Sequence, residues 1–238
     1  MEPSNSGMGL LEARALTYKI ISAGFIKLPS TNLIKLTIKD KLFDFFPLEL
    51  NTEEFQQGLL QLKLWSSQIN ETSLDNIVVQ LNADYNRLFV GPNHLLAPPW
   101  ESVYLTEERL TFDRITLDVR EFYGRHGLEF ILMNKEPDDH FGVELEFMAE
   151  LIHRQIQHLR KGQIEEASYI EKEQQAFLGL HLSKWTPHFT HSVLEGAHTD
   201  YYQGLARLAR DFIIWDYEYL SREDTQELRK SKDEWEVG

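Results

Sequence analysis

Cysteine is absent from this chain of 238 residues, and basic residues are few beside acidic ones, 24 against 38. Without cysteine the chain can form no disulfide, no thiolate metal site and no cysteine nucleophile, which favours a cytoplasmic protein. The formal net charge of −14 argues against nucleic acid as a partner, because that binding requires Lys and Arg to neutralise phosphates. The same charge serves solubility, and it would attract a basic peptide or a basic protein segment.

Long apolar runs are also missing, since no stretch of eighteen apolar residues occurs and no membrane span is expected. Residues 1–9 lack the basic and apolar blocks of a secretion signal. The Gly-rich phosphate loops and the G-x-S-x-G nucleophile elbow are absent as well. We therefore expect a protein that is not an enzyme and that holds no cofactor.

Strand signals are scarce, whereas apolar residues recur at helical spacing along most of the chain. Asn51 and Glu54 have the spacing of a capping box, and Asp138 or Asp139 is expected to cap a long amphipathic helix. The charged residues from Ser221 onward are expected to fray. The sequence predicts an all-α protein of about nine or ten helices, over residues 11–25, 32–46, 51–68, 73–91, 106–123, 138–160, 163–180, 184–194 and 199–220.

The proline-rich segment is the only plausible boundary inside the chain. It divides an N-terminal half, residues 8–91, from a C-terminal half, residues 106–220, with the loop at 92–105 and a charged tail at 221–238. Each half is small, so we expect one helical domain over residues 1–238 with a shared core. The loop could also act as a hinge for exchanging halves, which leaves a monomer or a domain-swapped dimer open.

Aromatic residues and prolines gather between Tyr85 and Tyr104, where they make up seven of twenty residues. Tyr85, Leu88 and Phe89 lie on one helix face by their spacing. Pro99 and the proline before it stiffen the backbone that presents Trp100. These side chains either line an apolar slot for a peptide or bury the junction between two halves.

A second segment, residues 136–140, places acids directly before the long amphipathic helix. Asp138 and Asp139 serve either as helix caps or, with Glu101 and Glu136, as an acidic rim that holds Arg or Lys side chains. His140 is either a first-turn residue or part of that rim.

Four motifs in order resemble the TorD/DmsD family of chaperones for molybdenum-cofactor redox enzymes. The resemblance covers residues 82–152, and its motifs are Tyr-x-x-Leu-Phe (Tyr85, Leu88, Phe89), Gly-Pro (Gly91, Pro92), Pro-Pro-Trp-Glu-Ser-Val-Tyr (Pro98 to Tyr104) and Glu-Pro-x-Asp-His (Glu136, Pro137, Asp139, His140). Two positions depart from the pattern: Tyr85 stands where tryptophan is expected, and the doubled acid at 138 and 139 leaves the register open by one residue.

The resemblance implies a non-catalytic protein that binds the twin-arginine signal peptide of a partner enzyme and delays export until the cofactor is inserted. Contact with the body of the apoprotein is implied as well. On this resemblance and on the acids beside it, the predicted peptide-binding residues are Tyr85, Leu88, Phe89, Pro99, Trp100, Glu101, Asp138, Asp139 and His140. In this interpretation, apolar contacts supply affinity and the acids orient the basic end of the peptide.

Two other functions stay open on the sequence. The first is a helical di-metal oxidoreductase, because Glu150 with His153 and Glu195 with His198 both read Glu-x-x-His. The phase of the helix opposes it, since Glu150 and His153 fall opposite the apolar stripe, and the pair at His188 and His191 lacks a third ligand. The second is a helical adaptor that binds some other basic amphipathic segment.

Overall fold

The structure, a computed structural model, describes residues 5–91, 95–106, 114–129 and 137–236, with side chains described between residues 7 and 222. Within these ranges the secondary structure is helical, apart from an isolated antiparallel bridge between Trp100 and His140. The prediction of an all-α fold is confirmed. The helices are α1 (Asn5–Phe25), α2 (Thr31–Lys39), α3 (Glu53–Ser67), α4 (Leu74–Tyr85), α5 (Glu101–Leu105), α6 (Arg114–Arg125), α7 (Phe141–Arg160), α8 (Ile164–Phe177), α9 (Ser183–Gly196) and α10 (Asp200–Glu236), with π-helical segments η1 (Asn86–Val90) and η2 (Leu178–Leu182).

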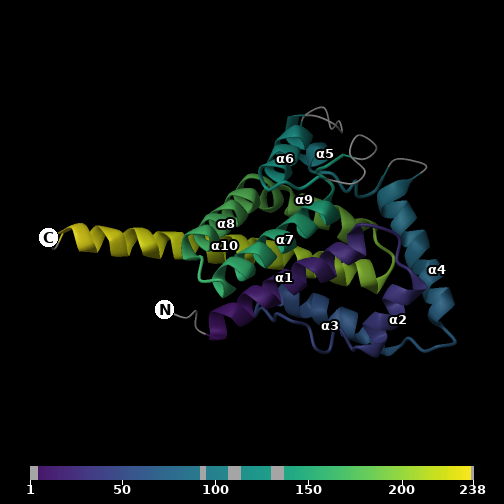
Figure 1. Cartoon of the computed structure of the whole chain (residues 1–238). Coiled ribbons are helices and arrows are strands. Elements are labelled where there is room, and N and C mark those ends of the chain that lie inside the picture. The colour runs from purple at the N-terminus through teal and green to yellow at the C-terminus, as the bar shows by residue number, and fades with distance from the viewer. Residues whose placement is uncertain (1–4, 92–94, 107–113, 130–136, 237–238) are drawn as a thin grey trace.

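Helices from both sides of the proline loop pack on one another. The contacts of α1 are mainly with α7, and those of α10 are mainly with α3 and α9, an arrangement that can be followed in Figure 1. One continuous cluster of buried apolar side chains includes Phe25 and Leu62 from the first half and Phe189 and Phe212 from the second. A single domain over the whole chain stays a prediction, and this shared core is what such a domain requires.

A buried ion pair crosses this core. The Arg14 guanidinium of α1 donates to the Asp216 carboxylate of α10. It also donates to Oε1 of Gln174 in α8, at 3.0 Å. The Tyr18 hydroxyl donates to the same Asp216 carboxylate at 2.7 Å. Arg14 and Asp216 are both 0% exposed. Three helices are thus joined by polar contacts where the surrounding side chains are apolar, so removing one partner would leave an uncompensated charge.

The second helix ends earlier than the predicted residue 46. It stops at Lys39 because Lys41 has a positive φ of 48°, a left-handed conformation that ends a helix. The amide of Lys41 donates to the carbonyl of Ile38 and the amide of Leu42 to that of Thr37, at 3.1 and 3.0 Å. This is the hydrogen-bond pattern of a Schellman cap, formed here without the usual glycine.

The capping box predicted at Asn51 and Glu54 is wrong. Thr52 is the N-cap of α3, and its side chain makes no capping hydrogen bond. The amide of Phe55 instead donates to Asp211 of α10 at 3.2 Å. The start of α3 is therefore capped by a residue more than 150 positions away, which the local pattern could not reveal.

Several other boundaries differ from the predicted ones. Residues 101–105 form α5 inside the predicted proline loop, and Thr106, the predicted start of the next helix, is extended. The expected residues 107–113 of that helix lie outside the described residues. The predicted break between 180 and 184 is absent, since α8, η2 and α9 follow without interruption.

The charged tail, predicted to fray from Ser221, is instead the distal part of α10, which runs to Glu236 and extends away from the other helices (Figure 1). Glu, Gln, Arg and Lys are favourable helix formers, which fits this continuation.

Candidate functional site

The two motif segments lie against each other. The amide of Glu101 donates to the carbonyl of Asp139 at 3.0 Å, and the amide of Phe141 donates to the carbonyl of Pro99 at 2.8 Å. Between these bonds lies the bridge of Trp100 with His140, whose rings meet edge to face at 6.4 Å. This direct contact supports the prediction that the two segments belong to one site. We call residues 97–105 together with residues 138–142 the fastened loops.

Asp139 holds the fastened loops to two helices. Its Oδ2 accepts from the Ser102 amide at the start of α5, and its Oδ1 accepts from the Thr116 hydroxyl of α6, both at 2.8 Å. The residue is 0% exposed. A carboxylate in this position satisfies an amide that a helix start leaves without an intrahelical partner. Asp139 therefore joins α5, α6 and the start of α7.

Asp138 has a different partner. Its Oδ2 accepts from Arg120 of α6, at 2.6 Å from Nη2 and 3.1 Å from Nε, and its carbonyl accepts from the Tyr123 hydroxyl at 3.1 Å. The hydrogen bond with this carboxylate raises the pKa of Arg120. Asp138 is buried, whereas the Arg120 side chain stays 32% exposed. Asp138 and Asp139 thus have different partners, although both carboxylates bind a side chain of α6.

The cap of α7 is His140, not one of the predicted aspartates. Its Nδ1 accepts from the Gly142 amide at 3.1 Å. Burial lowers the pKa of His140 to about 4, so the ring is neutral at pH 7 and can accept this hydrogen bond. The next turn packs closely on the end of α1, since a Cβ on Gly142 would lie 2.8 Å from Cα of Ile26. Glycine is required for that approach.

The aromatic helix face predicted to line a slot is part of the core. Tyr85, Leu88 and Phe89 are all less than 10% exposed. The Tyr85 hydroxyl donates to the carbonyl of Phe25 at 3.1 Å, and the Phe89 ring lies 5.6 Å from that of Tyr202. Their helix changes to π-helical geometry in η1, a feature often found at functional sites.

Burial divides the nine predicted site residues. Only Trp100 is partly exposed, while the other eight are buried: Tyr85, Leu88, Phe89, Pro99, Glu101, Asp138, Asp139 and His140. The indole Nε1 of Trp100 is buried and has no hydrogen-bond partner in the part of the chain that the structure describes. Peptide contact by these residues stays a prediction, and what the geometry shows for the buried eight is packing and positioning.

A buried polar cluster behind the fastened loops was missed by the sequence reasoning. The Glu101 carboxylate and His181 Nδ1 lie 2.9 Å apart, and Trp185 Nε1 donates to Glu144 at 3.1 Å. Burial raises the pKa of Glu101, and burial together with the nearby Glu101 and Asp139 raises that of Glu144 well above its ordinary value. One signal was available: Glu144 lies three residues after Phe141 and four before Met148, so helical spacing places it on the apolar face.

The residues of the di-metal alternative are spread over the surface and the end of α9. Glu150, 43% exposed, accepts from Arg154 at 2.9 Å, and His191 pairs with Glu195 at 3.4 Å. Over the described ranges, no three His, Asp or Glu side chains are grouped as a metal site requires.

The structure is all-helical over the residues described, and it brings together the two segments whose motifs resemble those of redox-enzyme maturation chaperones. Residues 49–191 match the family model described as the nitrate reductase delta subunit, and the chain belongs to that family. The TorD and DmsD chaperones are among its relatives. The resemblance inferred from the motifs is confirmed.

The relatives are named as chaperones rather than as enzymes. The Tat proofreading chaperone DmsD of Salmonella typhi is 36% identical over 126 residues, which cover 53% of this chain and 55% of that protein. The chaperone protein TorD of Aliivibrio fischeri is 26% identical over 194 residues, covering 74% of this chain and 89% of that one. The chain thus spans about half the length of the DmsD relatives that it matches.

A solved structure described as a putative redox enzyme maturation protein from Archaeoglobus fulgidus is 21% identical to this chain. It has a TM-score of 0.49 and covers 84% of this chain and 93% of its own. A likeness of this size carries no argument about function. Among the residues that the structure describes, none of the helices combines the length and the apolar character of a membrane span.

Proposed function

We propose that the protein is a cytoplasmic chaperone that binds the twin-arginine signal peptide of a molybdenum-cofactor redox enzyme. In this function it holds the apoprotein until the cofactor is inserted and only then releases it for export. The observation that carries the proposal is the direct fastening of the two motif loops, Glu101 to Asp139 and Phe141 to Pro99, in a chain of this family. Several relatives are named Tat proofreading chaperones, which supports the same function.

The peptide is proposed to meet the fastened loops at Trp100. This side chain is the accessible member of the predicted set, and an indole offers a large apolar area to a ligand. Because its Nε1 is buried, the proposed contact is made by the accessible carbon atoms of the ring. The remaining eight residues are proposed to act mainly by fixing the shape of the segment that carries Trp100.

Charge is proposed to orient the peptide. The net charge of −14 attracts the basic end of a twin-arginine peptide over a distance, and this attraction raises the rate of encounter more than the final affinity. Raising the salt concentration should then weaken binding modestly without abolishing it, because salt screens exposed charges and leaves apolar contacts in place.

Isothermal titration calorimetry tests the proposal with a synthetic twin-arginine peptide from a molybdoenzyme encoded beside this protein. Trp100→Ala should weaken binding at least tenfold because it removes the direct contact, and Asp139→Ala should weaken it because the loops loosen. Trp215→Ala is the matched control, since Trp215 is, like Trp100, a partly exposed tryptophan, and its ring stacks on Phe212 and Tyr219 of α10 rather than on the loops. Saturable binding by the wild type and the control, weakened in both loop variants, supports the proposal.

Two other results have clear meanings. If the wild type and both loop variants bind equally well, the chaperone function stands and the site is elsewhere. If a peptide with the two arginines replaced binds as tightly as the original, the protein is an adaptor for basic amphipathic segments in general. The exchange of halves between two chains stays a prediction, which light scattering with size-exclusion chromatography would test.

A further inference from the structure

A cleft of about 800 Å³ opens between α2, the connection from α3 to α4 and the first turn of α4. Its apolar lining comes from Ile38, Ile69 and Leu74, and the latter two are buried. The volume lies in the range of sites that hold a drug-sized ligand. Such a ligand is similar in size to a few peptide residues. None of the nine predicted peptide-binding residues lines it.

The cleft lies at the far end of α4 from the fastened loops. It borders Leu74 and Asp75 at the start of this helix, whereas Tyr85 ends it. Twelve helical residues span about 18 Å, and Figure 1 shows α2 beside one end of α4 and α5 beyond the other. A ligand in the cleft would therefore leave the fastened loops accessible.

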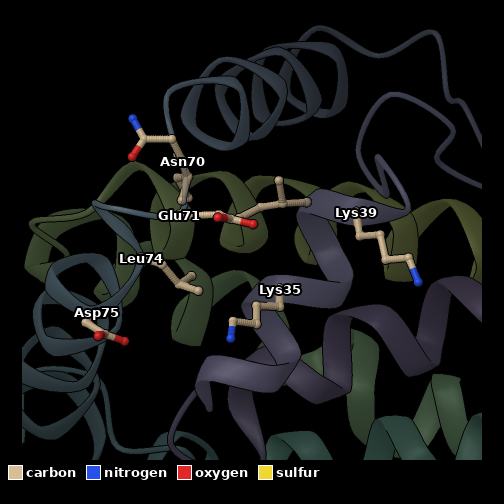
Figure 2. Close-up of a pocket in the computed structure, with 8 residues that line it drawn as sticks. Lys35, Lys39, Asn70, Glu71, Leu74 and Asp75 are labelled. Carbon is tan, nitrogen blue, oxygen red and sulfur yellow. The ribbon is translucent and has the colours of Figure 1, made fainter.

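Opposite charges line the two walls of the cleft. Lys35 and Lys39 come from α2, one helical turn apart, and Glu71 and Asp75 come from the α4 side, as Figure 2 shows. All four side chains are exposed. Over the residues that the structure describes, none of them forms an ion pair. These four charged side chains are therefore available to pair with a ligand.

A twin-arginine signal peptide does not match this lining. It presents a basic end and an apolar stretch, so it could satisfy Glu71 and Asp75 but would meet like charge at Lys35 and Lys39. A segment with apolar side chains in the middle, an acidic side chain on one flank and a basic side chain on the other matches all three parts of the cleft. Unpaired like charges would discriminate against other segments by repulsion.

We propose that the α2–α4 cleft binds a mixed-charge amphipathic segment of the client protein that lies outside its signal peptide. The inference rests on the proposed function, because it takes the client to be the enzyme whose signal peptide the chaperone binds. The apolar residues of the segment lie on Ile69 and Leu74, its acidic side chain pairs with Lys35 or Lys39, and its basic side chain pairs with Glu71 or Asp75. Signal peptide and client body then occupy opposite ends of α4.

The test uses the same molybdoenzyme in two forms, as the synthetic signal peptide and as the apoprotein without that peptide. Binding of each is measured to the wild type, to Lys35→Glu with Lys39→Glu, and to Glu71→Lys with Asp75→Lys. The controls change charge by the same amount at exposed sites elsewhere: Lys161→Glu with Lys184→Glu, and Glu121→Lys with Glu165→Lys. Glu165, like Asp75, lies in the first turn of its helix, so that control also matches the cost of reversing charge there.

The expected result is at least a tenfold loss of apoprotein binding in both cleft variants, with the signal peptide affinity and both controls unchanged within twofold. Overlapping peptides from the apoprotein should then identify a bound segment that carries both charges. Loss in the Glu71 and Asp75 variant alone would overturn the mixed-charge ligand. Loss of signal peptide binding in the cleft variants would assign the cleft to that peptide and overturn the inference.

The two proposals can fail separately. If the wild type binds the apoprotein but not the signal peptide, the proposed function fails while the cleft is still tested by the apoprotein. If the wild type and both cleft variants bind the apoprotein equally, or none of them binds it, the cleft inference is overturned and the signal peptide result stands by itself.

Discussion

The fastened loops and the α2–α4 cleft differ in where their charges lie. In the fastened loops, Asp138 and Asp139 are buried and each has named partners. In the cleft, Lys35 and Glu71 are exposed and unpaired in the described part of the chain. The buried motif acids thus fix the conformation of the fastened loops, whereas the α2–α4 cleft, whose charged side chains are exposed and unpaired over the described residues, is lined by no motif residue. Motif residues and ligand-contacting residues need not be the same set.

The largest expected effect separates these two regions by stability. Asp139→Ala leaves the Ser102 amide and the Thr116 hydroxyl buried without an acceptor, which should lower the free energy of unfolding by about 3 kcal/mol. Urea unfolding followed by circular dichroism measures it. A loss smaller than about 1 kcal/mol would mean that water or a neighbour replaces the carboxylate, and that Asp139 does not hold the loops.

A slightly smaller effect should appear as a dependence of stability on pH. The pKa of His140 is about 4 in the folded protein and about 6.5 in the unfolded chain. Its contribution to stability is therefore complete above pH 6.5 and is lost as the pH falls toward 4, by about 2 kcal/mol between pH 7 and pH 4.5. Because asparagine is also a good N-cap, His140→Asn should keep the cap and remove this part of the acid sensitivity. Parallel urea titrations at pH 7 and pH 4.5 make the comparison, and equal losses in both proteins would refute it.

Glu144 should give a smaller dependence of the opposite sign. Its folded pKa is raised well above the ordinary value, so the folded state keeps a proton that the unfolded chain releases above about pH 4.5. Its contribution is present at low pH and declines as the pH rises, by about 1 kcal/mol between pH 5 and pH 6. Glu144→Gln keeps an acceptor for Trp185 Nε1 and should flatten this slope between pH 5 and pH 6. An unchanged slope would show that Glu144 is ionised in the fold.

The smallest effect is expected in the cleft. Lys35→Glu and Glu71→Lys change exposed side chains without ion pairs in the described residues, and surface changes of this kind rarely alter stability. Their urea midpoints should match that of the wild type within error. A clear shift would show that these charges support the fold, which would weaken the contrast with the fastened loops.

The sequence predicted the fold well where one local pattern decides the outcome. The apolar stripe of α7, from Phe141 to Ile156, is buried as its helical spacing requires. The end of α2 was not predictable in the same way, because Lys41 adopts a left-handed conformation that usually signals itself through glycine. The cap of α3 was missed because Asp211 reaches it only through the tertiary fold.

The sequence indicated that the two motif segments lie together, but not that most of their residues are buried, and peptide binding by these residues stays a prediction. Tyr85 and Phe89 at helical spacing fit a groove or a core equally well, and the aromatic rings of α1 and α10 that cover them lie far away in the sequence. Arg120 and Thr116, which bind the two aspartates, come from α6. No local sequence pattern predicts that α6 contacts the loops.

Photo-crosslinking tests the central claim most directly. A twin-arginine signal peptide with a benzophenone side chain directly after the arginines would be irradiated with the chaperone, and the attachment site located by mass spectrometry. The account predicts attachment at Trp100 or elsewhere in residues 97–105, lost when unlabelled peptide competes. Attachment to residues 35–39 or 69–75 would place the signal peptide in the α2–α4 cleft and contradict the assignment of both regions.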